Sequence, residues 1–457
     1  MKQDNLTPIL IITPFFAPQT HAAMFRIHKL VKYLPHYGYR PIVLTTDTNY
    51  LYNNNKELLL ELPDCVEIIR TRHIEPSLRG LRMAFGGKDR SFSAIKNSKK
   101  DIDINEILPN RLFSSRPGGI LSVINSSVSR TLCSIPDAHW AWALASMSTA
   151  KKLVEKYDIK IMYTTANPYS HLGIAIELKD KLGVKWIADF RDPCGYGYKN
   201  SVNNYFGQKV QQKILQSTFD KADKVTGLSE TYSSIFSDLY GLNDSRYTFI
   251  PTGVDNDYLS CIKNVNDSYA SSIVFAGEVM PEQDCYIFRI LHNLHKNNPY
   301  LKMIFVGRSD VNRPIIDKVL ENISDWKIEV EYVDHLPQLE LYSILQSAKA
   351  CILAPGSNRY WWTNFAKMVD YIALGVPVIA DVPKLSEARK ELTKAGLGFF
   401  LERNSVEEDA LRLQEWLENN DRDEDDLCAD YRNRYLASSQ TKAFATLFDE
   451  IAKDIST

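Results

Sequence analysis

The sequence predicts an α/β protein built from two doubly wound parallel sheets. Short runs in which every residue is apolar, such as PILIIT at 8–13, alternate with longer segments that have a helical pattern. Strands that are apolar on all sides are typical of a parallel sheet covered by helices on both faces. The alternation occurs as two series, and a chain of 457 residues is too long for one ordinary core.

The first series occupies the N-terminal half of the chain. The strand at 8–13 leads through a proline-rich loop into a helix over about 22–37, and GYRPIVLTTD follows as a second strand. The later elements are a strand at 160–165, a helix over 171–182, a strand at 185–190, a helix over 204–221, and the short strands KVTGLS and YTFIP. Each strand is expected to be buried between layers of helices.

The second series begins at SSIVFAG, residues 271–277. It continues with helices over 284–296, near 313–321, over 337–347 and from 363, and with strands at 301–307, 328–333, 350–355 and 377–380. We place the domain boundary between Gly253 and Asn264, which gives domains of 1–255 and 256–437. A polar stretch at 419–427 precedes a last helix, and its part from about 438 to 457 is expected to pack back on the first domain. Two such sheets predict ligand binding at their strand ends, across a cleft.

Composition excludes several classes of protein. Hydrophobic residues make up 44% and charged residues 24% of the chain, which is an ordinary globular composition. A net charge of -2 argues against a nucleic-acid-coating protein. The seven cysteines include no CxxC pair, which argues against a disulfide framework or a zinc site. No segment approaches the roughly 20 apolar residues of a membrane span, so the expected location is cytoplasmic.

Six segments, in order, resemble the GT-B glycosyltransferases of the family-4-like group, which use nucleotide-sugar donors. They are TPFFAP with FRIHKLVKYLPHYGYRPIVLTTD, IPDAHWAW, TTANPYSHLGIAIELKDKLGVKWIADFRDP, KADKVTGLSE, IPTGVD and FAKMVDYIALGVPVIA. The resemblance implies a GT-B fold in which the first domain binds the acceptor and the second binds the donor.

The donor wall is predicted from residues that follow the strands of the second domain. A diphosphate leaving group is stabilised by a helix N-terminus and by a nearby cation. Thr363 and Asn364 fit the cap and first turn of such a helix, with Lys367 one turn in, and the resemblance implies that Asp370 binds the ribose. The other reading of Lys367 and Asp370 is an i,i+3 surface pair. The full set of donor-binding candidates is Gly277, Arg308, His335, Arg359, Thr363, Asn364, Lys367 and Asp370.

The sequence departs from the family pattern in the same region. Many members carry E-x7-E here, but the first glutamate falls on Trp362, inside NRYWWTN. Trp361 or Trp362 could stack on a sugar or a base, or pack in the core. The loop GEVMPEQD offers only acidic residues where relatives often have a basic one, which weakens the case for ordinary donor use. His335 has two readings, a nucleobase contact and a plain exposed loop residue.

The acceptor wall is predicted from ADFRDP and from two loops of the first domain. Three charges at the end of a buried strand are costly unless they are paired or serve a ligand, so both an Arg–Asp structural pair and an acceptor site remain open. The catalytic candidates are Asp189, Arg191, Asp192 and His171, and the acceptor-binding candidates are His21, Ala22, Arg26, Asn167 and Ser170. Relatives favour glycines where this chain has Ala22 and Ala23. The resemblance favours a retaining mechanism assisted by the leaving phosphate, which requires no protein base.

The segment 72–130 has a composition of its own. It contains 11 lysines and arginines against 5 acidic residues, a local net charge of +6, with apolar residues interleaved. Such an insert is expected either to dock on the anionic inner leaflet of the plasma membrane, where lipid-linked acceptors lie, or to be a solvated loop.

The sequence therefore predicts a metal-independent glycosyltransferase of cell-envelope assembly. Its partners would be a nucleotide-diphosphate sugar and a glycan or lipid-linked acceptor, and no cofactor is expected. No essential metal is expected either, because no Asp-x-Asp triplet that could hold the ion follows a strand. Two alternatives remain, a nucleotide-sugar epimerase and a non-catalytic partner of another transferase.

Overall fold

The structure is a computed structural model that describes residues 6–47, 54–73, 75, 76, 133, 135–195, 205–262, 267–419 and 428–453. The chain forms two compact units. Unit 1 comprises Met1–Gly227, Ser233–Thr248 and Phe444–Thr457, and unit 2 comprises Leu228–Tyr232 and Phe249–Ala443. Most of the basic insert, including Arg79, Arg82 and Lys88, lies outside the described residues.

Unit 1 is built on a seven-stranded sheet with the order β3-β2-β1-β4-β5-β6-β7, and the neighbouring pairs from β3 to β6 are parallel. The strands are β1 (Thr7–Ile12), β2 (Tyr39–Thr46), β3 (Glu67–Thr71), β4 (Ile161–Ala166), β5 (Lys185–Phe190), β6 (Lys224–Gly227) and β7 (Tyr247–Phe249). The helices are α1 (Ala22–Tyr33), α2 (Glu57–Leu60), α7 (Trp140–Lys156), α8 (Leu172–Leu182), α9 (Tyr205–Lys221) and α10 (Tyr232–Tyr240), with 3₁₀ turns η2 (Leu34–Tyr37) and η4 (Asp244–Arg246). Tyr232 is the one residue of α10 assigned to unit 2.

Unit 2 has a fully parallel six-stranded sheet with the order β10-β9-β8-β11-β12-β13. The strands are β8 (Ser272–Ala276), β9 (Lys302–Val306), β10 (Glu329–Val333), β11 (Ala350–Leu353), β12 (Val378–Ala380) and β13 (Gly398–Phe400). The helices are α11 (Asn256–Cys261), α12 (Tyr286–His295), α13 (Ser309–Leu320), α14 (Gln338–Ser347), α15 (Ala366–Leu374), α16 (Glu387–Lys394), α17 (Val406–Asn419) and α18 (Ala429–Arg432), and the 3₁₀ turns are η5 (Asp267–Tyr269), η6 (Asn358–Tyr360) and η7 (Asn433–Tyr435).

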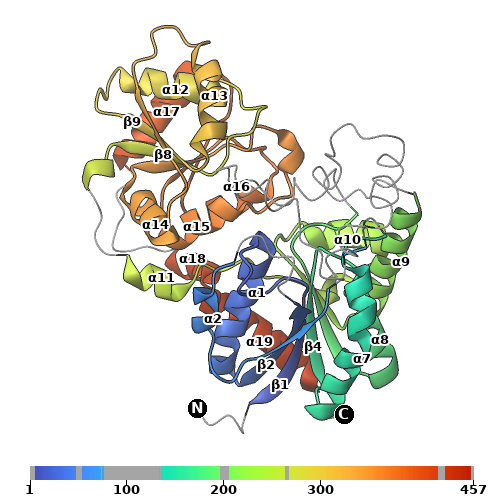
Figure 1. Cartoon of the computed structure of the whole chain (residues 1–457). Coiled ribbons are helices and arrows are strands. Elements are labelled where there is room, and N and C mark those ends of the chain that lie inside the picture. The colour runs from blue at the N-terminus through green and yellow to red at the C-terminus, as the bar shows by residue number, and fades with distance from the viewer. Residues whose placement is uncertain are drawn as a thin grey trace, which may run out of the picture. The chain divides into compact units, whose positions relative to one another are not determined.

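Alternation along the strands explains why helices cover both faces of the unit 2 sheet (Figure 1). On β8, Ile273 and Phe275 join a core with α12, α13 and α17, whereas Val274 and Ala276 join a second core with α14, α15 and α16. Successive side chains of a strand point to opposite faces, so an all-apolar strand needs cover on both. The prediction of two doubly wound parallel sheets is confirmed.

The last helix, α19 (Ala437–Lys453), belongs to unit 2 at its start and to unit 1 from Phe444 onward. Phe444 packs edge-on against Tyr163 of β4, and Phe448 packs against Tyr39 of β2. Figure 1 shows α19 in red beside β1, β2 and β4. Among the described residues no helix combines the length and the apolar character needed to cross a bilayer.

Candidate functional site

The ends of β8 and β9 form the centre of the candidate site in unit 2. Gly277 and Gly307 directly follow these strands, with φ of +94° and +149°. The Gly277 N–H donates to Val306 O at 2.7 Å, and its carbonyl accepts from Asn312 Nδ2 at 3.0 Å. A Cβ on Gly307 would lie 3.0 Å from Gly277 O, so this position tolerates only glycine without strain. We call Gly277 and Gly307 the glycine bend. Gly277 was predicted, whereas Gly307 and the buried Asn312 were missed.

Lys367, the second residue of α15, lies against this bend. Its Nζ is 3.9 Å from the centre of the Phe275 ring and 3.6 Å from the position of a Cβ on Gly277. Within the described part of the chain the ammonium forms no ion pair, so the surface pair with Asp370 is not present. Desolvation by burial lowers the pKa of Lys367 to about 7. A cation held without a carboxylate at a strand-end edge is suited to an anionic ligand.

The N-terminus of α15 corrects one sequence-based expectation. Phe365 is the N-cap residue and makes no side-chain cap hydrogen bond, so neither Thr363 nor Asn364 caps the helix. The chain first forms η6, and the Thr363 N–H donates to Tyr360 O at 3.0 Å, which delays the helix to Ala366. The first turn of α15 contains no acidic residue, so its positive end is not offset from within the helix. Thr363 Oγ1 is buried and has no hydrogen-bond partner among the described residues.

Asp370 is held by a neighbouring tyrosine. The Tyr342 hydroxyl donates to Asp370 Oδ1 at 2.8 Å, and burial, followed by the charge of Asp370, raises the pKa of Tyr342. This bond fixes the orientation of a half-buried carboxylate one helical turn from Lys367. Its predicted contact with a ribose stays a prediction.

The remaining donor candidates are less closely associated with this bend. Arg308 forms ion pairs with Asp310 at 3.1 Å and Glu278 at 3.4 Å, and the hydrogen bond to Asp310 chiefly raises its pKa. His335 and Arg359 are exposed. Trp362 is buried and lies 6.3 Å from Tyr232 between ring centres, which favours its core reading over a sugar-stacking one.

Three carboxylates in unit 2 could reach a common metal ion. Ligand atoms of Glu230, Glu387 and Glu391 lie within 4.8 Å of one another. Their oxygens already have protein partners, since Glu387 accepts from the Glu230 N–H at 2.7 Å and from Thr231 Oγ1 at 2.6 Å. Glu391 accepts from two tyrosine hydroxyls and pairs with a lysine, Lys394, at 3.3 Å. Because each carboxylate already has a hydrogen-bond or ion-pair partner in the protein, the cluster is explained as a structural hydrogen-bond network and does not require a metal ion.

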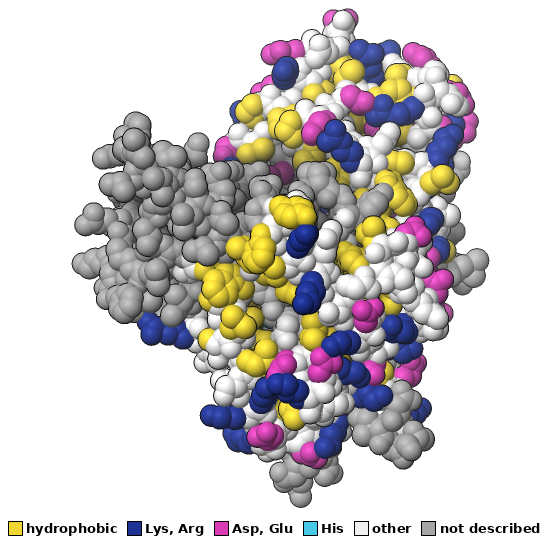
Figure 2. Space-filling view, turned by 90° about the vertical axis from the view of Figure 1, so that its right-hand side faces the viewer, with side chains coloured by type: hydrophobic (Ala, Val, Ile, Leu, Met, Phe, Trp, Pro, Cys, Tyr) yellow, Lys and Arg dark blue, Asp and Glu magenta, His cyan; other side chains and the backbone are white. Residues whose placement is uncertain are grey.

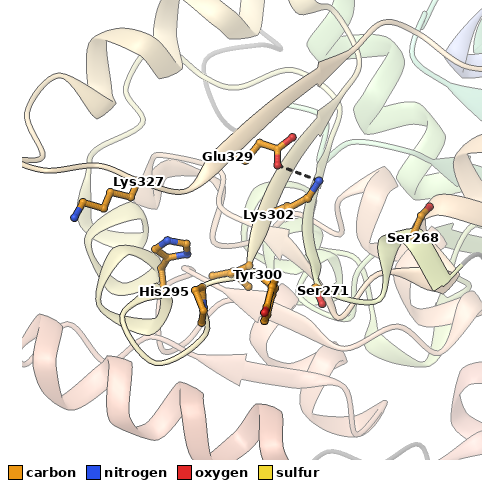
Figure 3. A pocket seen from close by; sticks show the side chains of 9 residues that line it. Ser268, Ser271, His295, Tyr300, Lys302, Lys327 and Glu329 are labelled. Atoms are coloured by element: carbon orange, nitrogen blue, oxygen red, sulfur yellow. Dashed lines mark ion pairs between the residues drawn. The ribbon is translucent and has the colours of Figure 1, made fainter.

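A hollow of about 440 Å³ lies elsewhere on unit 2 (Figure 3). Its lining includes Lys302 and Glu329, which begin β9 and β10 and form an ion pair at 3.0 Å. Parallel strands all start at one edge, so this hollow lies at the opposite edge of the sheet from Gly277 and Gly307. The hollow is therefore separate from the Lys367 site.

In unit 1, Asp189 lies at the centre of a buried network. Arg26 donates to both carboxylate oxygens at 2.9 Å, and Tyr163 and Thr226 donate at 2.8 and 2.7 Å. Burial would raise the pKa of Asp189, but the charge and hydrogen bonds of Arg26 outweigh it and hold that pKa below its usual value. Both side chains are almost fully inaccessible to water. This geometry favours the structural pair, with Arg26 as the partner, and does not support Asp189 as a base or Arg26 as an acceptor ligand.

The other charges of ADFRDP are differently placed. Arg191 is half-buried and donates to the Asn167 carbonyl, and desolvation lowers its pKa. Asp192 and Asn167 are exposed. His21 caps α1 by accepting from the Ala23 N–H at 3.0 Å, and Ala22 is exposed at the start of that helix. These residues all follow the carboxyl ends of β1, β4 and β5, as predicted for the acceptor wall.

Asp137, in the motif IPDAHWAW, organises the loop after β4 and was missed. It accepts hydrogen bonds from Tyr169 N at 2.7 Å, Ser170 N at 2.9 Å and Ser170 Oγ at 2.7 Å. It also accepts from His139 N at 2.9 Å. Four donors on one carboxylate fix the position of the segment that carries Ser170 and His171.

Four histidines gather beside Asp137. The His73 and His139 rings stack at 5.0 Å, and Phe15 bridges His139 and His21, with ring centres 5.1 and 4.4 Å away. Burial lowers the pKa of His73 to about 3 and those of His139 and His171 to about 4. Neither nitrogen of the fully buried His171 has a hydrogen bond of normal geometry among the described residues, although the Thr165 backbone lies close enough to affect its pKa. Neutral imidazoles each offer one donor and one acceptor, which suits hydroxyl groups.

Comparison with known proteins supports the fold. Neither any protein-family model nor any curated protein sequence matches the chain. A glycosyltransferase from Rickettsia africae ESF-5 matches structurally with a TM-score of 0.57 and 14% identity, covering 98% of this chain and 99% of that one. Sucrose-phosphate synthase from Thermosynechococcus elongatus matches with a TM-score of 0.54 and 14% identity, with the same coverage. Anabaena Alr3699/HepE, in complex with UDP and glucose, matches with a TM-score of 0.50 and 12% identity over 98% of this chain and 99% of that one. The chain therefore has the GT-B fold, with one Rossmann-like sheet in each of its two units.

Proposed function

We propose that the protein transfers a sugar from a nucleotide-sugar donor to a hydroxyl group of an acceptor. The observation that carries the proposal is Lys367, whose ammonium lies unpaired by any described carboxylate beside the glycine bend at Gly277. A nucleotide sugar presents two phosphates, and their charge increases on the departing diphosphate as the sugar leaves. A desolvated cation at a helix N-terminus matches that charge.

In this proposal unit 2 binds the donor. Lys367 and the first turn of α15 contact the diphosphate, while the absence of a side chain at Gly277 leaves room for it beside Lys367. Asp370, oriented by Tyr342, accepts hydrogen bonds from the ribose hydroxyls. His335 and Arg359 are the exposed side chains available to the nucleobase and sugar, and Arg308 contributes only if it leaves Asp310 and Glu278.

Unit 1 binds the acceptor in the same proposal. Ser170 and His171 lie on the loop fixed by Asp137, and His21, Ala22, Asn167, Arg191 and Asp192 lie on neighbouring strand ends. His139 is half-buried and neutral, so it can donate to and accept from a sugar hydroxyl without attracting a counter-ion. His171 is fully buried, so it is assigned no direct contact with the acceptor. The mechanism is retaining, with the leaving phosphate taking the acceptor proton, so no side chain is required as a base.

The biological setting is part of the proposal. The acceptor is a lipid-linked or polysaccharide intermediate of cell-envelope assembly, met at the inner face of the plasma membrane by a protein of the cytoplasm. No metal is essential, because Lys367 and the helix N-terminus supply the positive charge that a divalent cation would provide.

A thermal-shift screen tests donor binding. Uridine, guanosine, cytidine and adenosine diphosphates are added separately, with and without a chelator, because a ligand that binds only the folded state raises its melting temperature. We expect one nucleotide to raise the melting temperature equally in both conditions, and Lys367→Met to abolish the rise. A rise that disappears with the chelator would refute metal independence, and no rise with any nucleotide would refute the donor site.

Of the two alternatives, one is supported by specific observations. A non-catalytic partner is favoured by Trp362, which is buried where many relatives carry a glutamate, and by the pairing of Arg308 with acidic residues. Weak or absent nucleotide affinity would identify it. A nucleotide-sugar epimerase would convert the donor without any acceptor, so product formation from donor alone would identify that reaction.

A further inference from the structure

The first turns of α9 expose two adjacent aromatic side chains. Tyr205 is 71% exposed and Phe206 is 62% exposed. Among the large hydrophobic side chains that are exposed in the described part of the chain, they are the only pair adjacent in sequence. Scattered single apolar side chains are normal on a protein surface, whereas contiguous ones are typical of a surface that contacts a partner.

Lysines share this face of α9. The Lys209 Nζ lies 4.5 Å from the centre of the Tyr205 ring, and Lys213 is exposed one turn further on. Residues 205, 209 and 213 are spaced at i,i+4 and therefore lie in one row. We call Tyr205, Phe206, Lys209 and Lys213 the α9 face.

The opposite side of α9 holds the helix in place. Gly207, Gln211, Leu215 and Phe219 are buried, and the Phe219 ring stacks on Phe190 of β5 at 5.0 Å. The exposed aromatics are thus presented from a helix whose other side is fixed in the core. Figure 2 views the side of the molecule on which α9 lies in Figure 1, and it shows hydrophobic side chains beside lysine and arginine side chains.

The positive charge of α9 favours a negatively charged partner. Residues 205–219 contain two lysines and no acidic residue, a net charge of +2, in a chain whose total is -2. Aromatic side chains settle at the level of lipid headgroups, and lysines beside them are attracted to anionic lipids. A negatively charged and partly apolar surface is complementary to both properties of the α9 face.

We propose that the α9 face docks on an anionic lipid bilayer, with Tyr205 and Phe206 entering the headgroup region and Lys209 and Lys213 contacting lipid phosphates. The inference deepens the proposed function, because it names the surface on which a lipid-linked acceptor is met. Docking does not depend on nucleotide binding by unit 2, so each claim can fail without the other.

Vesicle sedimentation of the full chain tests the proposal. The vesicles contain phosphatidylcholine alone or an equal mixture with phosphatidylglycerol, at low and high salt. We expect binding only to the anionic vesicles and loss of that binding at high salt. Lys209→Glu with Lys213→Glu is expected to weaken binding more than about twentyfold, because each lysine near such a surface contributes roughly fivefold. Tyr205→Ser with Phe206→Ser is expected to weaken it about tenfold.

Matched changes on unit 2 provide the control. Tyr300 is 78% exposed and Lys296 is exposed, so Tyr300→Ser with Lys296→Glu changes the same residue types away from α9. We expect this control to bind as the unchanged protein does, and every variant to retain its melting temperature. Equal binding by the α9 variants and the unchanged protein would overturn the proposal. So would binding to neutral vesicles alone, or loss of binding only when Arg79, Arg82 and Lys88 are replaced.

Discussion

The ammonium of Lys367 lies 3.9 Å from the centre of the Phe275 ring and has no anionic partner among the described residues. The ring face supplies part of the stabilisation that water would give to the cation, but desolvation still lowers the pKa of Lys367 to about 7. A lysine in this state favours an anion that can restore its charge. The donor half of the proposed reaction therefore depends on this one side chain.

Replacement of Lys367 should weaken ligand binding and stabilise the folded protein. Lys367→Met is expected to weaken nucleotide-diphosphate binding by roughly 2–3 kcal/mol, since a buried charged contact is lost. The same change should raise the melting temperature at pH 6, because the folded protein no longer holds a desolvated charge there. Isothermal calorimetry and thermal unfolding measure the two effects. Lys318→Met, at an exposed position on α13, is the control and should alter neither.

The Arg26–Asp189 pair should be essential to folding rather than to chemistry. Arg26→Met leaves a buried carboxylate without its counter-charge and is expected to cost about 3–5 kcal/mol in the free energy of unfolding. Arg26→Met with Asp189→Leu should recover much of that loss, because it removes both charges. Denaturant unfolding measures each value. A single variant that keeps its stability but loses transfer would instead assign the pair to catalysis.

Acid should weaken unit 1 through the same pair. The pKa of Asp189 is lower in the folded protein than in the unfolded chain, so the unfolded chain binds the proton first as pH falls. The stabilisation is complete above the ordinary aspartate pKa and is lost as pH falls through the lower, folded value. Unfolding measured from pH 6 downward should show a loss that Arg26→Met with Asp189→Leu reduces.

The fold was predictable from sequence because its main signal is local. All-apolar runs indicate strands. Gly277 directly follows one such strand, β8, and Lys367 lies in the helix between two others, β11 and β12. Contacts between distant segments were not predictable: Arg26 and Asp189 are 163 positions apart, and Asp137 and Ser170 are 33 apart. The start of α15 was predicted too early because the Thr363 N–H bonds to Tyr360 O at the end of η6, so the helix begins only at Ala366.

The glycine bend can be tested by one methyl group. Gly307→Ala places a Cβ 3.0 Å from Gly277 O at a φ of +149°, and we expect a cost of about 1–3 kcal/mol in stability and a weaker nucleotide affinity. Gly173→Ala is a matched control, because Gly173 lies in α8 with no atom within 4 Å of the added Cβ. That control should stabilise the protein by up to about 1 kcal/mol. Equal effects at both positions would contradict a strained bend.

Asp137 should position the acceptor loop without affecting the donor. Asp137→Asn retains one acceptor oxygen but loses the charge that serves four donors, so a loss of about 1.5–3 kcal/mol in stability is expected. In transfer assays the KM for the acceptor should rise while nucleotide affinity is unchanged. Asp158→Asn, at an exposed aspartate of unit 1, is the control and should change neither quantity. A fall in nucleotide affinity would show that Asp137 serves the donor.

Proton uptake on donor binding is the most direct test of the account. The diphosphate of a nucleotide sugar has no terminal phosphate monoester that titrates near neutral pH, so a sugar derivative of the nucleotide found by the thermal-shift screen isolates the response of the protein. At pH 8 most Lys367 side chains are neutral, and an adjacent diphosphate raises the pKa of Lys367 and recharges it. Calorimetry in two buffers of different ionisation enthalpy should show uptake of close to one proton, absent in Lys367→Met. Binding of that nucleotide sugar at pH 8 without proton uptake, or with the same uptake in Lys367→Met, would contradict the account.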